Sequence, residues 1–290
     1  MKRIILISVA ALGIAFGAHA QELTGTLKKV KEANVITIGH RETSTPFSFL
    51  DENQRPAGYS IDICLAIVEA VKRRINAPKL QVRYVAVNAQ NRLPLVANGT
   101  VDMECGVTTN NEERQRQVGF THNSYITGLS LMTRRGSGLA RLSDLKGKAV
   151  SVAAGSTNER LIRRFNEEQR LDLNILPAKD TGEAFLLLET GRVDAYASDE
   201  ILLFAQRSKS KTPSDFDVVG GLLSFEPYSI VIRRGDLDFE KTANDALAAL
   251  FRSPEYQAMY DKWFKTASLN VPMNAALRQA ISSPNNNPAR

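Results

Sequence analysis

Short apolar runs alternate with helically spaced apolar stripes along most of this sequence. The run 35–40 predicts a buried strand, and residues 80–87 alternate between apolar and polar positions as a second strand does. Between them, apolar residues at helical spacing predict a helix, at Ile61, Cys64, Leu65, Val68 and Val71. Strands that alternate with helices in this way are typical of βαβ units and predict a mostly parallel sheet.

The same alternation returns in the second half of the chain. A predicted strand at 149–153 is followed by the spacing Ser156-x-x-Glu159, which is a capping box and opens a helix. Further on, Thr181 is predicted to cap a helix, and the strand after that helix leads to Asp199. The second half therefore predicts a second α/β unit.

Two short stretches, 96–102 and 188–194, share one pattern: a helix end, Gly, one residue, and a Val-Asp pair that opens a strand. Each strand then ends in polar side chains, Thr108 and Thr109 in the first half and Asp199 in the second. Ligands of open α/β sheets bind beyond the carboxyl ends of the strands. We therefore expect two lobes of similar winding, with a cleft between their strand ends.

Two extended stretches rich in β-branched residues, 125–133 and 228–233, are expected to pair and to cross between the lobes. The predicted fold class is α/β, with each lobe a mostly parallel sheet flanked by helices and two crossing strands between the lobes. Lobe 1 would comprise residues 21–127 and 227–275, lobe 2 residues 128–226, and residues 276–290 would form a polar C-terminal tail, disordered from Ser282.

The N-terminus has the pattern of a cleavable secretory signal peptide. Lys2 and Arg3 precede an apolar stretch at 4–17, and Ala18-His19-Ala20 is a small-residue cleavage site. No Cys follows the expected cleavage site, so we expect a protein that starts at Gln21, carries no lipid anchor there and works in the periplasm. No later stretch is apolar for long enough to be a membrane helix.

Removing Lys2 and Arg3 lowers the formal net charge from +6 to +4, because the predicted signal peptide contains no acidic residue. A basic exported protein suits anionic ligands, whereas export argues against a nucleic-acid partner. Cys64 and Cys105 are the two cysteines of the chain. We expect two buried free thiols, with a disulfide as the alternative because an exported protein meets oxidising conditions.

The stretch 98–114 concentrates the candidate chemistry. Arg114 offers a planar fork of donors that fits a carboxylate, and Thr108 or Thr109 adds a hydroxyl. The alternative is a surface loop with an exposed Arg. The sequence contains no phosphate loop, dinucleotide fingerprint, zinc-type spacing or nucleophile motif, so we expect no cofactor, no metal and no catalytic residue.

Several motifs resemble the periplasmic glutamate/aspartate-binding proteins of bacterial ABC importers, which belong to family 3 of extracellular solute-binding proteins. The matching blocks run in order along nearly the whole mature chain: Gly39-His40-Arg41-Glu42, Pro46-Phe47-Ser48, Gly58-Tyr59-Ser60, Gln90-Asn91-Arg92, Glu104-Cys105-Gly106, Thr108-Thr109-Asn110-Asn111, Asp144-Leu145-Lys146-Gly147-Lys148, Asn166-Glu167-Glu168-Gln169, Ala178-Lys179-Asp180, Leu188-Glu189-x-Gly191-Arg192 and Asp261-Lys262-Trp263-Phe264. The resemblance implies a two-lobed periplasmic-binding-protein clamp of type II. It also implies a monomer that delivers an acidic L-amino acid to an inner-membrane ABC permease.

The resemblance also implies roles for individual residues. Arg114 would pair with the ligand α-carboxylate, helped by Thr109 and by the helix N-terminus at Ser156 and Thr157. Asp199 would take the α-ammonium group. Arg41 and Arg92 would reach the side-chain carboxylate, and the alternative for this pair is two surface salt bridges.

This chain departs from the family pattern at Ala89, Val107 and Thr181, where the family has Ser, Ser and His. Each change removes a hydrogen-bonding or charged partner, so the choice among glutamate, aspartate and a related dicarboxylate stays open.

Two other functions are alternatives to transport. One is an exported dehydratase-like enzyme, which would need Glu104 or Glu200 as a general acid or base, and the other is a chemosensory binding protein.

Overall fold

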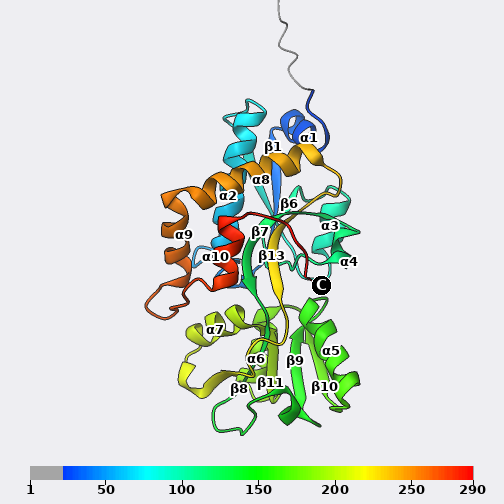
Figure 1. Cartoon of the computed structure of the whole chain (residues 1–290), viewed down its shortest axis with the longest axis vertical. Helices are drawn as coiled ribbons and strands as arrows, with labels where there is room; N and C mark the ends of the chain where they lie inside the picture. Colours follow the sequence, from blue (N-terminus) through cyan, green and yellow to red (C-terminus); the bar gives the residue numbers. More distant parts are fainter. Residues whose placement is uncertain (1–21, 290) are drawn as a thin grey trace, which may run out of the picture.

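The computed structural model describes residues 22–289, which form two lobes joined by a narrow waist (Figure 1). The predicted signal peptide, residues 1–20, lies outside the described residues. The α-helices are α1 (Gly25–Ala33), α2 (Tyr59–Arg74), α3 (Arg92–Ala97), α4 (Glu112–Gln115), α5 (Thr157–Gln169), α6 (Thr181–Glu189), α7 (Glu200–Lys209), α8 (Leu237–Arg252), α9 (Pro254–Phe264) and α10 (Ala275–Ser282), and the 3-10 helices are η1 (Leu142–Leu145) and η2 (Pro213–Asp215). Among residues 22–289, no helix is long and apolar enough to cross a membrane.

Lobe 1 is built on a five-stranded sheet. Its strand order is β5 (Gln81–Ala86), β1 (Val35–His40), β6 (Met103–Glu104), β13 (Glu226–Ile232) and β7 (Gly119–Thr127). β5, β1 and β6 run parallel, whereas β13 is antiparallel to both β6 and β7. The sheet is therefore mixed rather than mostly parallel, because the chain that returns from the other lobe enters it in the opposite direction.

The apolar side chains of lobe 1 alternate between two cores, as the pleat of a strand requires. Ile230 and Ile232 of β13 join the larger core under α2, α8, α9 and α10, and Val231 between them joins a smaller core with α3. A small sheet of β2 (Thr43–Ser44), β3 (Ser48–Leu50) and β4 (Pro56–Ala57) lies at the edge that faces the other lobe, where Thr43 contacts Thr181.

Lobe 2 has the corresponding architecture. Its strand order is β10 (Asn174–Ala178), β9 (Ala149–Ala153), β11 (Ala195–Asp199), β8 (Leu129–Arg134) and β12 (Phe216–Val219). β10, β9 and β11 are parallel, and β8 is antiparallel to β11 and β12. Leu131 and Met132 point to opposite faces of the sheet and enter two different cores, one with Ile162 of α5 and one with Leu188 of α6.

The two crossings between the lobes touch each other at the waist. β7 continues into β8 through Gly128, and residues 220–225 connect β12 to β13. A Cβ added to Gly128 would lie 2.1 Å from the carbonyl oxygen of Ser224, so only glycine fits there. The predicted pairing is found between β7 and β13, while β8 pairs within the sheet of lobe 2.

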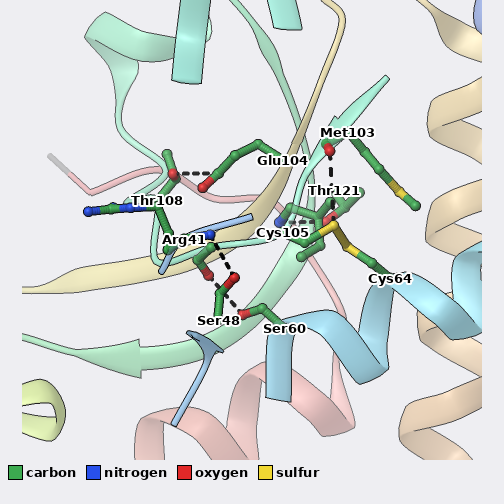
Figure 2. Close-up of a disulfide and its surroundings, with 11 residues drawn as sticks. Arg41, Ser48, Ser60, Cys64, Met103, Glu104, Cys105, Thr108 and Thr121 are labelled. Carbon is green, nitrogen blue, oxygen red and sulfur yellow. Dashed lines mark hydrogen bonds between the residues drawn. A yellow bond between two sulfur atoms is a disulfide. The ribbon is translucent and has the colours of Figure 1, made fainter. Parts of the chain in front are cut away.

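Cys64 and Cys105 form a disulfide, so the expectation of two free thiols is wrong. Their Cα atoms are 6.3 Å apart, and Figure 2 shows the bond between α2 and the end of β6. Cys64 lies on the buried face of α2, which packs on this sheet, and so comes next to Cys105, the residue that follows β6. The bond therefore anchors the start of the loop that carries Thr108 and Thr109.

Replacing both cysteines with alanine should lower the free energy of unfolding by about 2–4 kcal/mol, because the bond restricts the unfolded chain across a separation of 41 residues. Denaturant unfolding followed by circular dichroism measures the change. The unaltered protein in reductant should match the variant, and equal stability of variant and oxidised protein would contradict the expectation.

Residues 276–289 have a defined structure, contrary to the prediction of a polar C-terminal tail over 276–290 that is disordered from Ser282. α10 is capped by Asn274, whose side chain accepts a hydrogen bond from Leu277 N at 2.7 Å. Leu277 and Ala280 share one helical face and are buried against β7 and α8. The apolar residues Leu277, Ala280 and Ile281 occur at helical spacing, but the polar residues around this segment led to the prediction of a tail.

The predicted capping box at the start of α5 is present in part. The Ser156 hydroxyl accepts a hydrogen bond from Glu159 N at 3.1 Å, and the Glu159 carboxylate reaches Gly155 N rather than the capping residue itself. The prediction that Thr181 caps α6 is wrong. Asp180 is the cap, with its carboxylate 3.0 Å from Glu183 N, and Thr181 is the first helical residue.

Candidate functional site

The strand ends of the two lobes meet in a closed cleft. Thr109 of lobe 1 lies 3.3 Å from Thr157 of lobe 2 between hydroxyl oxygens, and the Thr181 hydroxyl lies 3.1 Å from the Thr43 carbonyl oxygen. The Tyr228 hydroxyl of β13 donates to the Asp199 carboxylate at the end of β11. Polar side chains from distant parts of the sequence therefore enclose one space between the lobes.

Three arginines of lobe 1 are buried in this cleft. Arg41 follows β1, Arg92 opens α3 and Arg114 lies in α4, and each is at most 4% exposed. Among the described residues, no ion pair within 4.0 Å joins any of the three to a carboxylate. The alternatives of an exposed Arg114 and of surface salt bridges at Arg41 and Arg92 are therefore wrong.

Backbone carbonyls hold the arginines in part. Arg114 Nη1 donates to the Thr109 carbonyl oxygen at 3.0 Å, and Arg92 Nη1 donates to that of Val107 at 3.4 Å. Burial, and next the nearby Arg92, lowers the pKa of Arg114 to about 9 and that of Arg41 to about 10. Arg41 and Arg114 therefore remain protonated at neutral pH. Glu104 acts on both pKa values in the opposite direction, so the cleft holds charges of both signs, and an anion placed between the guanidiniums would reduce their mutual repulsion.

Asp199 is the acidic group that the sequence placed in the cleft, and it is buried there. Burial, and next the nearby Glu226 carboxylate, raises the pKa of Asp199 to about 7, whereas the Tyr228 hydroxyl and Arg114 act in the opposite direction. A cation beside Asp199 would favour its ionised form. The Asp199 carboxylate is therefore suited to receive an ammonium group.

Two buried carboxylates of the cleft were not predicted as ligand-binding residues. Glu104 is fully buried, and its Oε2 accepts a hydrogen bond from the Thr108 hydroxyl at 2.7 Å (Figure 2). Glu226 Oε2 accepts hydrogen bonds from Thr109 at 2.6 Å and Thr157 at 2.8 Å. In both cases the available signal was a charged residue within an otherwise apolar strand sequence, which is rare without a partner.

Six buried polar atoms of the cleft residues have no hydrogen-bond partner. Lobe 1 contributes Arg41 Nη2, Arg92 Nε and Glu104 Oε1, and lobe 2 contributes Asn158 Oδ1, Tyr196 OH and Asp199 Oδ1. These groups act on one another electrostatically, since Tyr196 influences the pKa of Arg41 and Asp199 that of Arg92. A buried unpaired polar group costs about 1–3 kcal/mol, so donors and acceptors gathered in this way indicate a ligand with both signs of charge.

The remaining predicted site residues lie at the edges of the cluster. Ser156 is half-buried, and its hydroxyl is engaged in capping α5 and in a bond to the Ala153 carbonyl oxygen. Thr108 points to Glu104, and Thr181 closes the cleft against Thr43. Thr157, Thr181 and Asp199 of lobe 2 therefore contact lobe 1 directly, whereas the hydroxyls of Ser156 and Thr108 bond to residues of their own lobes.

Two surface hollows reach this cluster from different sides. One of about 480 Å³ is lined by Thr109, Thr157 and Glu226, together with Arg160 and Phe225 at its rim. A smaller one of about 180 Å³ is lined by Arg41, Asn91 and Asp180.

The sequence of this chain is similar to those of bacterial solute-binding proteins. Residues 36–266 match the family described as bacterial extracellular solute-binding proteins, family 3. The L-glutamate/L-aspartate-binding protein of Pseudomonas aeruginosa is 46% identical over 288 residues, which is 96% of this chain and 95% of that protein. The glutamate/aspartate import solute-binding protein of Escherichia coli is 40% identical over 288 residues, with 97% and 95% covered.

Solved structures share the fold. An ancestral arginine-binding protein bound to arginine is 28% identical, with a TM-score of 0.72, and the match covers 80% of this chain and 98% of that one. The predicted two-lobed clamp of type II is thereby confirmed.

Proposed function

Because the chain belongs to the bacterial extracellular solute-binding proteins, family 3, we propose that it captures L-glutamate or L-aspartate between its lobes and delivers it to an inner-membrane ABC permease. The observation that carries the proposal is the enclosed cluster of three arginines and Asp199, with polar atoms left unpaired on both lobes. A ligand with two carboxylates and one ammonium group would supply the charges that complement this arrangement.

Each charged group of the ligand has a proposed partner. Arg114 binds the α-carboxylate, assisted by Thr109 and Thr157 and by the amide N–H groups at the start of α5. Asp199 binds the α-ammonium. Arg41 and Arg92 bind the side-chain carboxylate. Because these two positive guanidinium groups lie close together, they would repel the positive charge of a basic ligand side chain.

Ser156, Thr108 and Thr181 have supporting roles in this proposal. Ser156 caps the helix that faces the α-carboxylate, Thr108 orients Glu104 among the arginines, and Thr181 closes the cleft on the side-chain end of the ligand. Lobe 1 (residues 21–127 and 227–275) and lobe 2 (residues 128–226) close on the ligand about the waist at Gly128.

The same proposal covers cellular context. The protein is secreted by its N-terminal signal peptide and acts in the periplasm as a monomer. There the two closed lobes together form the surface that the permease recognises. The relatives named above are binding proteins for amino acids rather than enzymes.

Calorimetry on ligand-stripped protein tests the substrate class. The panel is L-glutamate, L-aspartate, their amides, L-arginine and glutarate. The two acidic amino acids should bind best, and each amide at least about tenfold more weakly, because a charge-assisted contact to Arg41 and Arg92 is lost. Preferred binding of an amide or of arginine would reject the acidic substrate.

Affinity for L-glutamate should fall as the pH drops below about 7, which is the pKa of Asp199 in the free protein. The ligand ammonium binds the ionised carboxylate, so the full affinity is present well above this pKa, and below it a proton must leave first. We expect up to about a tenfold loss per pH unit and proton release on binding near neutral pH. Titrations in buffers of different ionisation enthalpy measure that release, and affinity that is constant from pH 5 to 8 would contradict the assignment.

A further inference from the structure

The segment 284–289, which we call the strap, follows α10 and runs across lobe 1 toward α4 (Figure 1, dark red). It has no regular secondary structure apart from a bridge between Ala289 and Asn111. Ala289 also lines the hollow that contains Thr109 and Glu226. The strap therefore ends beside the proposed α-carboxylate site without contributing a ligand-binding side chain.

Backbone carbonyls of the strap accept hydrogen bonds from lobe 1. Asn123 of β7 donates its backbone N–H to the Asn285 oxygen at 2.7 Å and its side-chain Nδ2 to the Asn287 oxygen at 3.0 Å. Between these, the Asn286 oxygen accepts from Asn110 Nδ2 at 2.9 Å and from Gln115 Nε2 at 3.2 Å. Every strap residue from 285 to 287 is thus held through its main chain.

Asn110 connects the strap to the loop that carries the ligand-binding threonines. It is fully buried, and its backbone N–H donates to the Pro227 oxygen of β13 at 2.8 Å. The Asn110 carbonyl oxygen accepts from Ala289 N at 2.8 Å, and Asn110 Oδ1 accepts from Gln115 of α4 at 2.8 Å. The strap therefore completes the hydrogen bonding of a residue that lies next to Thr109.

The neighbouring residue extends this connection to Arg114. Asn111 pairs with Ala289, and its side-chain oxygen caps α4 by accepting from Arg114 N at 2.9 Å. The strand β13 also holds this loop, since Ser229 N donates to the Thr108 oxygen at 3.1 Å and Asn110 N to the Pro227 oxygen at 2.8 Å, and the strap adds its bonds to these at Asn110 and Asn111. Loss of the strap would leave the Asn110 carbonyl oxygen without a partner beside the binding site, and the Asn110 side-chain amide would keep only its bonds to Asn123 Oδ1 at 3.3 Å and to Gln115.

We propose that the strap is a positioning element for ligand binding: through Asn110 and Asn111 it fixes Thr109 and Arg114 in the geometry that receives the α-carboxylate. This inference rests on the proposed function for its ligand. Ordering of a binding group in advance raises affinity by reducing the entropy lost on binding, so the strap acts on affinity without touching the ligand.

A variant that stops after Ser283 tests the strap. Its dissociation constant for L-glutamate should rise on the order of tenfold, while its midpoint of thermal unfolding changes little. Amide hydrogen exchange in the ligand-free state should accelerate at Asn110, Arg114 and Gln115 but not in the strands of lobe 2. Ala289→Pro, which removes only the N–H that reaches Asn110, should change both quantities in the same direction by a smaller factor.

Asn286→Ala is the matched control, because it keeps the carbonyl oxygen that accepts from Asn110 and Gln115, and it should bind like the unaltered protein. Unchanged affinity and unchanged exchange in the truncated variant would overturn the proposal. If the complete chain fails to bind L-glutamate, the proposed function is wrong. Amide exchange at Asn110, Arg114 and Gln115 in the truncated variant then still tests whether the strap positions the loop. If the truncated variant does not fold, the affinity and amide exchange of Ala289→Pro test the proposal instead.

Discussion

Arg114→Ala should reduce affinity for L-glutamate by about 30-fold to 4,000-fold, because removing one partner of a buried charge pair costs about 2–5 kcal/mol. The guanidinium is buried, its pKa is lowered to about 9, and Arg92 lies close enough to repel it. The ligand-free variant should therefore unfold at the same temperature as the unaltered protein or at a higher one. Calorimetry and thermal unfolding measure the two effects.

Arg116→Ala provides the control for this prediction. Arg116 is two residues away, exposed and at the end of the same short helix, so its loss changes the net charge equally without opening the cleft. Comparable loss of affinity in both variants would mean that long-range charge, and not direct contact with Arg114, attracts the ligand.

Asp199→Asn should weaken L-glutamate binding by a similar factor and remove the discrimination between L-glutamate and glutarate. The amide has the shape of the carboxylate and can keep a contact with Tyr228, but it provides no charge for the ligand ammonium. The dependence of affinity on pH near 7 should disappear with it. Titrations of both ligands at pH 6 and pH 8 measure these effects.

Glu200→Gln is the neighbouring control, since Glu200 is only partly buried and follows Asp199 as the first residue of α7. It should leave affinity and pH dependence unchanged. An Asp199→Asn variant that still prefers L-glutamate to glutarate would show that another group receives the ammonium.

The alternation of the longer strands and helices was predictable because those elements have an apolar period and a local start or stop signal, whereas α10 was missed. The place of Arg114 in the cleft followed from the rule that ligands of open α/β sheets bind beyond the carboxyl ends of the strands, whereas the roles of Arg41 and Arg92 were implied by the resemblance to the glutamate/aspartate-binding proteins. These predictions therefore depend on local sequence, on a general rule of sheet topology and on family motifs.

The failed predictions depend on contacts between distant segments. Whether Cys64 meets Cys105 is decided by how α2 packs on β6, and no local pattern records that distance. Glu226 became part of the site only when Thr109 and Thr157 were brought together from two lobes. The polar composition of residues 283–289 suggested disorder. Their main-chain oxygens, however, accept hydrogen bonds from side-chain amides of lobe 1, and such bonds leave no periodic pattern in the sequence.

The position of β13 inside the sheet of lobe 1 bears on the order in which the two lobes can fold. β13 separates β6 from β7, and it follows all five strands of lobe 2 in sequence. A chain that emerges N-terminus first can therefore complete the sheet of lobe 2 while lobe 1 still has a gap between two of its strands. The lobe that is translated first is the lobe that is finished last.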